Sequence, residues 1–341
     1  MCCAHAEVSG AVSRVVYLNG ELVPESEAKI SIYDSALMFG DMVFEMTRSF
    51  NKRQFRLREH LERLFASMRY VHIPSPVTIG QMERLCAEVQ AANDPVFDDD
   101  DEHRLMINVS RGPLGFYAEI FDGRLEPTLV IADFPLKWTV AAMGHLFDTG
   151  INAVVTSQRA IPAQLLDPKL KSRSRLHYQM ANIEAANVKG ADNWALLLDP
   201  DGYVAEGTGD NFFIVSGGHI LTPEPRNILR GISRAYVMEL AKELAIPCLE
   251  RNIELYDVAN ADEAFMSGTP FCVLPVTRIN GAPIGDGHVG PVFKRVLERW
   301  STNVGLDVEG QIKAWATRIA QGHAHPAAPT PYQFQPQSTV R

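Results

Sequence analysis

Apolar and polar residues in the first part of the chain alternate in short runs separated by turn residues. Residues 15–25 place β-prone side chains on both sides of an Asn-Gly pair at 19–20, and this pair favours the positive φ angles of a two-residue turn. Residues 42–57 repeat the pattern around an Asn-Lys pair at 51–52. The chain is therefore predicted to open with two β-hairpins.

The following segments change to the helical period. Residues 58–71 carry apolar side chains at i, i+3, i+4 and i+7, which places them on one face of an amphipathic helix. These side chains are Leu61, Leu64, Phe65 and Met68. A second helix is predicted over 78–93, and strands are predicted over 104–112 and 127–136.

The second half of the chain predicts a larger unit in which strands outnumber helices. Asp-Gly and Gly-Gly pairs mark tight turns between its apolar runs. In chain order the predictions are a strand over 151–160, an antiparallel ladder over 193–223, a helix over 231–245, a strand pair over 263–281 and a helix over 290–305. The helix over 231–245 is expected to pack Val237, Leu240, Ala241 and Leu244.

These elements predict an α+β (mixed α/β) fold in two domains, a small N-terminal α/β domain and a larger C-terminal domain rich in antiparallel strands. The expected division is a flexible N-terminus over 1–14, the small domain over 15–138, an interdomain loop over 139–150, the large domain over 151–315 and a disordered tail over 316–341. The tail is assigned as disordered because it is rich in Pro and Gln.

Composition narrows the classes of function. The net charge of −9 argues against nucleic acid or an anionic membrane as a main partner. No apolar run approaches the roughly 20 residues that span a bilayer, and the first residues lack the pattern of a signal peptide. Five cysteines form neither a disulfide framework nor a CxxC metal spacing, so a reducing cytoplasm is expected and no metal site is predicted. The acidic run 98–103 is interpreted as a solvated loop.

One short stretch concentrates positive charge in this acidic chain. Lys169, Lys171, Arg173 and Arg175 stand at alternating positions before a predicted helix. A lysine that forms a Schiff base must lose its proton, and neighbouring cations favour the neutral amine. The pattern therefore suits a catalytic lysine, although a basic surface patch on an exposed loop explains the cluster equally well by itself.

Three further stretches offer groups for a charged ligand. Glu206 ends a strand before a glycine-rich turn and could hold a proton on a heterocycle nitrogen, or it is an ordinary turn acid. Gly231 and Ser233 open a helix whose free N–H groups suit a phosphate, or Ser233 is simply the helix cap. Gly268 and Thr269 form a second small-residue turn after a strand.

Arg63 lies on the predicted helix over 58–71, four residues after Glu59. The ordinary interpretation is a surface ion pair between these two side chains. The alternative is a guanidinium that reaches from the small domain to an anion, because its planar fork matches phosphate oxygens. Together, a Schiff-base lysine, a carboxylate for a ring nitrogen, two phosphate-binding turns and an arginine are what pyridoxal 5′-phosphate requires.

Six motifs in order make the chain similar to the fold type IV PLP-dependent aminotransferases over roughly residues 15–305. This family includes branched-chain aminotransferases, D-amino-acid aminotransferases, (R)-selective amine transaminases and aminodeoxychorismate lyases. The motifs are "FGDMVFEMTR", "FRLREHLERL", "LDPKLKSRSRL", "EGTGDNFF", "ILRGISR" and "FMSGTPF".

The resemblance implies a role for each candidate. Lys171, four residues after Asp167, would form the Schiff base, and Lys169 would be supporting charge. Arg63 would bind the cofactor phosphate together with Gly231, Ile232, Ser233, Gly268 and Thr269. Glu206 would pair with the pyridine nitrogen, and Leu229 would pack on the ring face opposite the substrate.

The substrate side departs from the family pattern. D-amino-acid enzymes bind the α-carboxylate with an arginine and a histidine where this chain has Phe116 and Ala118. Branched-chain enzymes use a tyrosine and an arginine where this chain has Met106 and Asn108. The pocket is therefore expected to be mainly apolar, with Arg48 as its one mobile cation. The full expected lining is Phe44, Met46, Arg48, Met106, Asn108, Phe116 and Pro270.

The resemblance implies an aminotransferase that moves an amino group from a hydrophobic, branched-chain-like amino acid or amine to a 2-oxo acid through a Lys171 Schiff base. An (R)-amine or D-amino-acid:pyruvate transaminase is the alternative, and an aminodeoxychorismate-type lyase comes after it. The resemblance also implies a homodimer that binds the small-molecule donor and acceptor, with no nucleic-acid or membrane partner.

Overall fold

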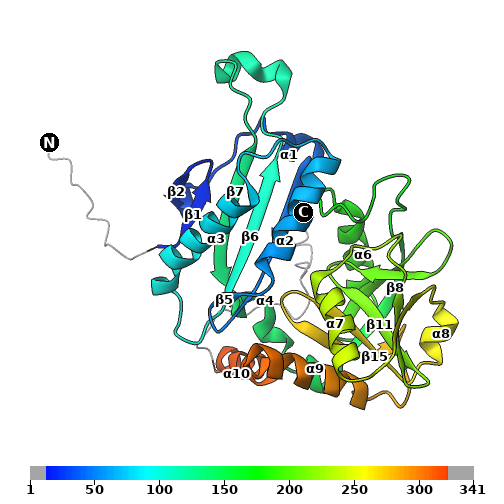
Figure 1. Ribbon diagram of the computed structural model, residues 1–341. Helices are drawn as coiled ribbons and strands as arrows, with labels where there is room; N and C mark the ends of the chain where they lie inside the picture. The colour runs from blue at the N-terminus through cyan, green and yellow to red at the C-terminus, as the bar shows by residue number, and fades with distance from the viewer. Residues whose placement is uncertain (1–12, 322–341) are drawn as a thin grey trace, which may run out of the picture.

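The computed structural model describes residues 13–321, which form two β-sheets with helices packed against them (Figure 1). Nearly all of the predicted flexible N-terminus, and residues 322–341 of the predicted tail, lie outside these residues. The main helices are α2 (Leu57–Tyr70), α3 (Ile79–Asn93), α6 (Leu176–Ala186), α7 (Ile232–Glu243), α9 (Pro291–Val304) and α10 (Val308–Ala320). Short helices are α1 (Ser35–Phe39), α4 (Lys137–Val140), α5 (Leu146–Thr149) and α8 (Leu255–Ala259).

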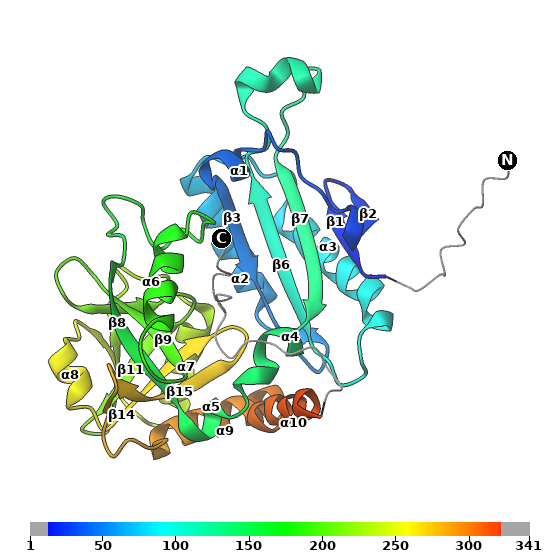
Figure 2. The ribbon, with the colours of Figure 1, turned by 180° about the vertical axis from the view of Figure 1, so that it is seen from behind.

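The N-terminal part is a five-stranded antiparallel sheet in the order β2-β1-β7-β6-β3. Its strands are β1 (Val15–Leu18), β2 (Glu21–Pro24), β3 (Met42–Met46), β6 (His103–Ser110) and β7 (Thr128–Pro135). Helices α2 and α3 cover one face of the sheet (Figure 1), and apolar residues of both helices form a core with alternate residues of β3, β6 and β7. Figure 2 shows the opposite face, on which neither helix lies.

The C-terminal part is a nine-stranded sheet in the order β10-β9-β8-β15-β14-β11-β12-β13, with β16 beside β15. Its strands are β8 (Ile151–Arg159), β9 (Asn193–Leu198), β10 (Val204–Gly207), β11 (Asn211–Ser216), β12 (His219–Pro223), β13 (Cys248–Arg251), β14 (Glu263–Gly268), β15 (Cys272–Ile279) and β16 (Ala282–Pro283). A pairing between Glu206 and Asn211 joins β10 to β11, so six of these strands close into a ring.

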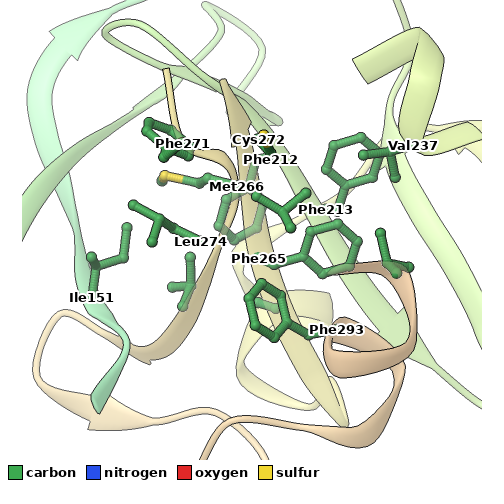
Figure 3. Close-up of a cluster of buried hydrophobic side chains, with 14 of the residues drawn as sticks. Ile151, Phe212, Phe213, Val237, Phe265, Met266, Phe271, Cys272, Leu274 and Phe293 are labelled. Carbon is green, nitrogen blue, oxygen red and sulfur yellow. The ribbon is translucent and has the colours of Figure 1, made fainter. Parts of the chain in front are cut away.

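The core of the larger sheet is built from aromatic and aliphatic side chains of its central strands and of the helices outside them. Phe213 and Phe265 stack with ring centroids 4.9 Å apart, and Phe293 of α9 packs on Phe265 (Figure 3). The ladder over 193–223 is antiparallel as predicted. However, β8 pairs parallel with both β9 and β15, so the middle of this sheet is mixed. The predicted two-part α+β architecture is confirmed.

The predicted hairpin over 42–57 is only partly correct. The two-residue turn at 51–52 joins β4 (Ser49–Phe50) to β5 (Arg53–Gln54), whereas β3 pairs with β6 instead. The prediction of a solvated loop over 98–103 is wrong at its end, because Asp101, Glu102 and His103 are buried. Glu102 accepts hydrogen bonds from the backbone N–H groups of the turn, 2.7 Å from Asn51 and 3.0 Å from Lys52. The carboxylate thereby satisfies donors that a tight turn leaves unpaired.

The segment expected to be an interdomain loop, 139–150, is largely helical. It contains the end of α4, a 3₁₀ turn (η4, Ala141–Met143) and α5, and it buries Val140, Leu146 and Phe147 in the core of the larger sheet. The start of the predicted disordered tail is also wrong, because residues 316–320 belong to α10. Trp315 of this helix is 1% exposed. Burying this face provides the free energy that orders the helix.

Candidate active site

One pocket brings together groups from five separate parts of the chain. It is lined by the segment before α6, the turn between β10 and β11, the start of α7 and the end of β14, with one side chain from α2. All nine residues predicted to bind the cofactor line it: Arg63, Lys171, Glu206, Leu229, Gly231, Ile232, Ser233, Gly268 and Thr269. The pocket therefore unites motifs that the sequence shows only as separate stretches.

Lys171 is held by backbone contacts to the N-terminal part. Its carbonyl oxygen accepts a hydrogen bond from Phe44 N at 2.9 Å, and its Nζ lies 4.9 Å from the centroid of the Phe44 ring. Burial lowers the pKa of Lys171 to about 7, aided by the positive charges of Arg63 and Arg175 and opposed by nearby carboxylates. A large fraction of this amine is therefore neutral and nucleophilic near neutral pH.

Lys169 occupies a different environment two residues earlier. Its Nζ forms an ion pair with Asp167 at 2.7 Å and donates to Arg226 O at 3.0 Å. These partners hold the amine in an ion pair and a hydrogen bond, although one of them, Asp167, is itself part of the pocket lining. Lys169 is absent from that lining, whereas Lys171 is part of it.

Arg63 is positioned by a buried carboxylate that sequence reasoning missed. Its Nε and Nη2 donate to Glu45 at 2.6 and 2.8 Å, and His60 Nδ1 lies 2.7 Å from the same carboxylate. Burial alone would raise the pKa of Glu45, but the charges of Arg63 and His60 hold it well below its usual value. Arg63 also donates to Arg230 O at 2.8 Å. The ordinary interpretation of a pair between Arg63 and Glu59 is therefore wrong.

Glu206 also lines the pocket, 4% exposed on β10. Its carboxylate accepts from Tyr178 Oη at 2.9 Å, from Asn211 Nδ2 at 3.0 Å and from Leu229 N at 3.0 Å. Burial raises the pKa of Glu206 to about 7, against the opposing effect of these hydrogen bonds and of nearby cations. A carboxylate with this pKa both accepts and releases a proton near neutral pH.

The start of α7 supplies backbone donors. Gly231 is its N-cap residue, so the predicted alternative of Ser233 as the cap is wrong, and no side chain caps this helix. The first N–H groups of a helix have no partner within it, and they favour an anion. A Cβ at Gly231 would lie 2.0 Å from Asn211 Oδ1, so only glycine fits beside the asparagine that holds Glu206.

Four of the residues expected to line the substrate pocket share one face of the five-stranded sheet. We call it the second face: it lies opposite α2 and α3 and carries Phe44, Met46, Arg104, Met106 and Asn108, as the strand register and the two-residue alternation require. Phe44 connects this face to the pocket, because its ring lies beside both the Lys171 amine and the Arg173 guanidinium.

The expectation that Arg48 is a mobile cation is wrong. Arg48 is 1% exposed, and its Nη1 donates to Pro270 O at 2.9 Å and to Cys272 Sγ at 3.4 Å. Phe116 is also misplaced by the prediction. It is 71% exposed on η3 (Gly115–Phe121), the excursion between β6 and β7 that projects beyond the sheet (Figure 1). None of the seven predicted substrate-pocket residues is among the residues that line the pocket around Lys171.

Comparison with known proteins assigns the chain that forms this pocket to a family. Residues 42–279 match the amino-transferase class IV family, and this match covers more than half of the chain. The chain belongs to this family. The matched residues include almost all of the pocket, from Arg63 to Thr269.

Individual relatives agree with the assignment to the class IV aminotransferases. The chain is 37% identical over 288 residues, 84% of its length and 94% of the relative's, to a protein of Methanocaldococcus jannaschii named provisionally as a branched-chain-amino-acid aminotransferase. It is 31% identical over 294 residues, 83% of its length and 90% of the relative's, to the branched-chain-amino-acid aminotransferase of Salmonella typhimurium.

Solved structures give the same result for the fold. The branched-chain amino acid aminotransferase of Escherichia coli superposes with a TM-score of 0.76 at 28% identity, covering 86% of this chain and 94% of that chain. The enzyme of Thermoproteus uzoniensis with norvaline has a TM-score of 0.74 at 29% identity, covering 89% and 98%. Within residues 13–321 of this class IV aminotransferase, no helix is long and apolar enough to cross a membrane.

Sequence reasoning missed three side chains that shape the pocket, namely Glu45, Tyr178 and Asn211. Each acts by holding another residue: Glu45 holds Arg63, and the other two hold Glu206. Of these three residues, Tyr178 is the one that the sequence indicates most clearly. It is the third residue of the helix that follows Lys171, and it combines an apolar ring with a polar hydroxyl close to a candidate site.

Proposed function

We propose that this class IV aminotransferase uses pyridoxal 5′-phosphate to transfer an amino group from a hydrophobic, branched-chain amino acid to a 2-oxo acid. The observation that carries the proposal is the placement of Lys171, Glu206 and Arg63 in one pocket at the start of α7. Solved relatives support the cofactor, since one is a branched-chain aminotransferase with pyridoxamine 5′-phosphate and another is in its PLP-form.

The residues of the pocket fit this cofactor. The backbone N–H groups of Ile232 and Ser233, and the Arg63 guanidinium with the N–H groups that Glu45 and Arg230 do not use, would hold its phosphate, because they combine a helix N-terminus with a cation. Gly231 has no Cβ, and a Cβ there would collide with Asn211 Oδ1 beside the start of α7. Glu206, as a carboxylate, would accept a hydrogen bond from the protonated pyridine nitrogen and so keep this nitrogen protonated. When bound, the cofactor supplies an electron sink for the carbanion formed at the substrate Cα.

Lys171 would bind the cofactor covalently and then serve as the acid and base that transfers the proton of the substrate Cα. Its pKa of about 7 lets the amine accept a proton from the substrate Cα and return it near neutral pH. Phe44 and Arg175 restrict the position of this amine, because the Phe44 ring lies beside it and the Arg175 guanidinium lies 5.5 Å from the same ring. Lys169, paired with Asp167, would take no part.

A hydrophobic donor is supported by the side chains of the second face, which Phe44 connects to Lys171. Phe44, Met46 and Met106 present an aromatic ring and two thioethers on the second face, and these groups suit an aliphatic side chain. Relatives that share 30% or more of their sequence with this chain carry the name branched-chain-amino-acid aminotransferase. Activity with a D-amino acid or an (R)-amine, and elimination without amino transfer, are the outcomes that would replace this proposal.

The visible spectrum of purified protein loaded with pyridoxal 5′-phosphate tests the proposal. We expect a band from the lysine-bound cofactor that bleaches with L-leucine and returns with 2-oxoglutarate. Lys171→Ala should abolish the band and turnover, whereas Lys169→Ala should largely retain both. D-alanine and (R)-1-phenylethylamine, in separate cuvettes, test the alternatives. Loss of the band in Lys169→Ala alone would reverse the assignment of the lysine.

We also propose a homodimer in a reducing, cytoplasmic compartment. Large apolar side chains of α1 and α6 are exposed near the pocket, with Phe39 at 68% and Leu176 at 74%. These two elements are adjacent, because Ser174 donates to Phe39 O at 3.2 Å. A second copy would bury this surface. Sedimentation equilibrium should give twice the chain mass, and Leu176→Asp should shift it toward the monomer.

A further inference from the structure

Three arginines meet on or beside the second face of the five-stranded sheet. Arg104 belongs to this face, and its Nη2 contacts Met46 Sδ at 3.7 Å. Arg173 donates to Asn108 Oδ1 from Nε at 2.9 Å and from Nη2 at 2.7 Å. Arg48 follows β3 directly. The positive charges of Arg48 and Arg173 act on Arg104, which together with its burial lowers the pKa of Arg104 to about 10.

Two of these guanidinium groups have donors without acceptors. Among residues 13–321, Arg48 Nη2 and Arg104 Nε are buried and make no hydrogen bond. Neither Arg48 nor Arg104 forms an ion pair with a carboxylate in this part of the chain, although most buried cations in proteins are paired. Concentrating unpaired positive charge in one place costs free energy, and an anion that binds there would recover it.

Arg173 connects this group of arginines to the reacting amine through the Phe44 ring. The Arg173 guanidinium carbon is 3.7 Å from the centroid of the Phe44 ring, and Lys171 Nζ is 4.9 Å from the same centroid. Arg48 reaches the turn that contains Thr269 by donating to Pro270 O. Since proline has no N–H group, this turn offers no backbone donor at position 270. Met106, which faces Met46 across the second face, offers no donor either.

We propose that Arg104, supported by Arg48 and Arg173, forms the site that binds a carboxylate of the substrate in this enzyme. Guanidinium groups pair with carboxylates through short, charge-assisted hydrogen bonds, and the free Nε of Arg104 is such a donor. The carboxylate would be the α-carboxylate of the amino donor or the distal carboxylate of a dicarboxylic acceptor. Arg104 would thus determine specificity, because it would bind the carboxylate group of the substrate.

The inference rests on the proposed function, and calorimetric titration of the holoenzyme separates the two. The probes are 4-methylpentanoate, glutarate and the uncharged 4-methylpentanamide, titrated into the wild type, Arg104→Gln, Arg104→Lys and the matched control Arg58→Gln. Arg58 lies on α2 with its side chain 53% exposed. If the wild type exchanges amino groups with no amino acid, the proposed function is refuted. The inference about Arg104 is tested separately, by comparing the ligand affinities of the variants with those of the active wild type.

We expect Arg104→Gln to weaken binding of the carboxylates by about 10- to 100-fold, as for the loss of a charged hydrogen bond, and to leave binding of the amide unchanged. Arg104→Lys should fall between Arg104→Gln and the wild type. A loss with both acids identifies the α-carboxylate, and a loss with glutarate alone identifies the distal one. Unchanged affinity for both acids, or an equal loss with the amide, would overturn the inference.

Thermal unfolding distinguishes binding from a structural role. Because Arg104 is repelled by its two neighbours and has no anionic partner in the described residues, Arg104→Gln should unfold at the same temperature as the wild type or a higher one. A lower unfolding temperature together with the same loss for all three probes would mean that Arg104 only supports the fold, and it would refute the inference.

Discussion

The carboxylate of Glu45 gives the sharpest test of how this site is held together. It is fully buried and accepts three short hydrogen bonds, two from Arg63 and one from His60. Glu45→Gln keeps the shape of the side chain but removes its charge and leaves one donor facing an amide N–H. Breaking a buried ion pair from one side typically costs about 3–5 kcal/mol, and we expect a loss of about 3 kcal/mol in the free energy of unfolding.

The loss should depend on pH with a defined sign. The pKa of Glu45 is depressed in the folded state, so its contribution is complete above the unfolded value of about 4.3 and is lost as pH falls toward the folded pKa. The part of the difference that comes from the Glu45 charge itself should therefore be fully present above about pH 6. It should shrink by up to about 1.4 kcal/mol per pH unit below about 4.3.

Urea unfolding of the holoenzyme at one protein and cofactor concentration measures this difference. Glu59→Gln is the matched control, because Glu59 is exposed on α2, the helix that carries Arg63. The control should change the free energy of unfolding by less than about 0.5 kcal/mol. Equal losses in the two variants, or a Glu45→Gln loss that persists unchanged at low pH, would refute the reasoning. Cofactor affinity should also fall in Glu45→Gln, since Arg63 loses the partner that aims it.

Three further predictions concern the pocket and the core. The rate at which pyridoxal 5′-phosphate attaches to cofactor-free protein should rise with pH around a midpoint near 7, because the lowered pKa of Lys171 sets this midpoint. A midpoint near 10 would contradict the lowered pKa. Gly231→Ala should weaken cofactor binding at least about tenfold in an absorbance titration, because its Cβ would displace the asparagine that bonds the pocket carboxylate; Gly80→Ala, in an open position on α3, is the control. Trp315→Ala should cost about 3–5 kcal/mol in urea unfolding, and the more exposed Trp138→Ala should cost clearly less; equal costs would mean that α10 adds little to the core.

Local features of the site could be predicted because their chemistry depends on near neighbours in the chain. The glycine at the start of α7, the helical period of α2 and the cations around Lys171 are patterns of a few residues. Together with the family resemblance, they identified nine of the residues that line the pocket, and the order of the motifs identified the family. The choice of Lys171 over Lys169 also followed from motif spacing, and the separate ion pair of Lys169 supports it.

The tertiary structure alone decided which distant side chains meet. Arg63 could pair with Glu59 on its own helix, but folding brings it to Glu45 in the sheet, where burial strengthens the ion pair. Arg48 contacts Pro270 across 222 residues, so its fixed position could not be seen in its own motif. The helix α10 was hidden by a Pro- and Gln-rich neighbourhood and forms because Trp315 finds a buried place. Sequence patterns thus determined the chemical groups and local elements, while long-range packing determined the partners and charges of these groups.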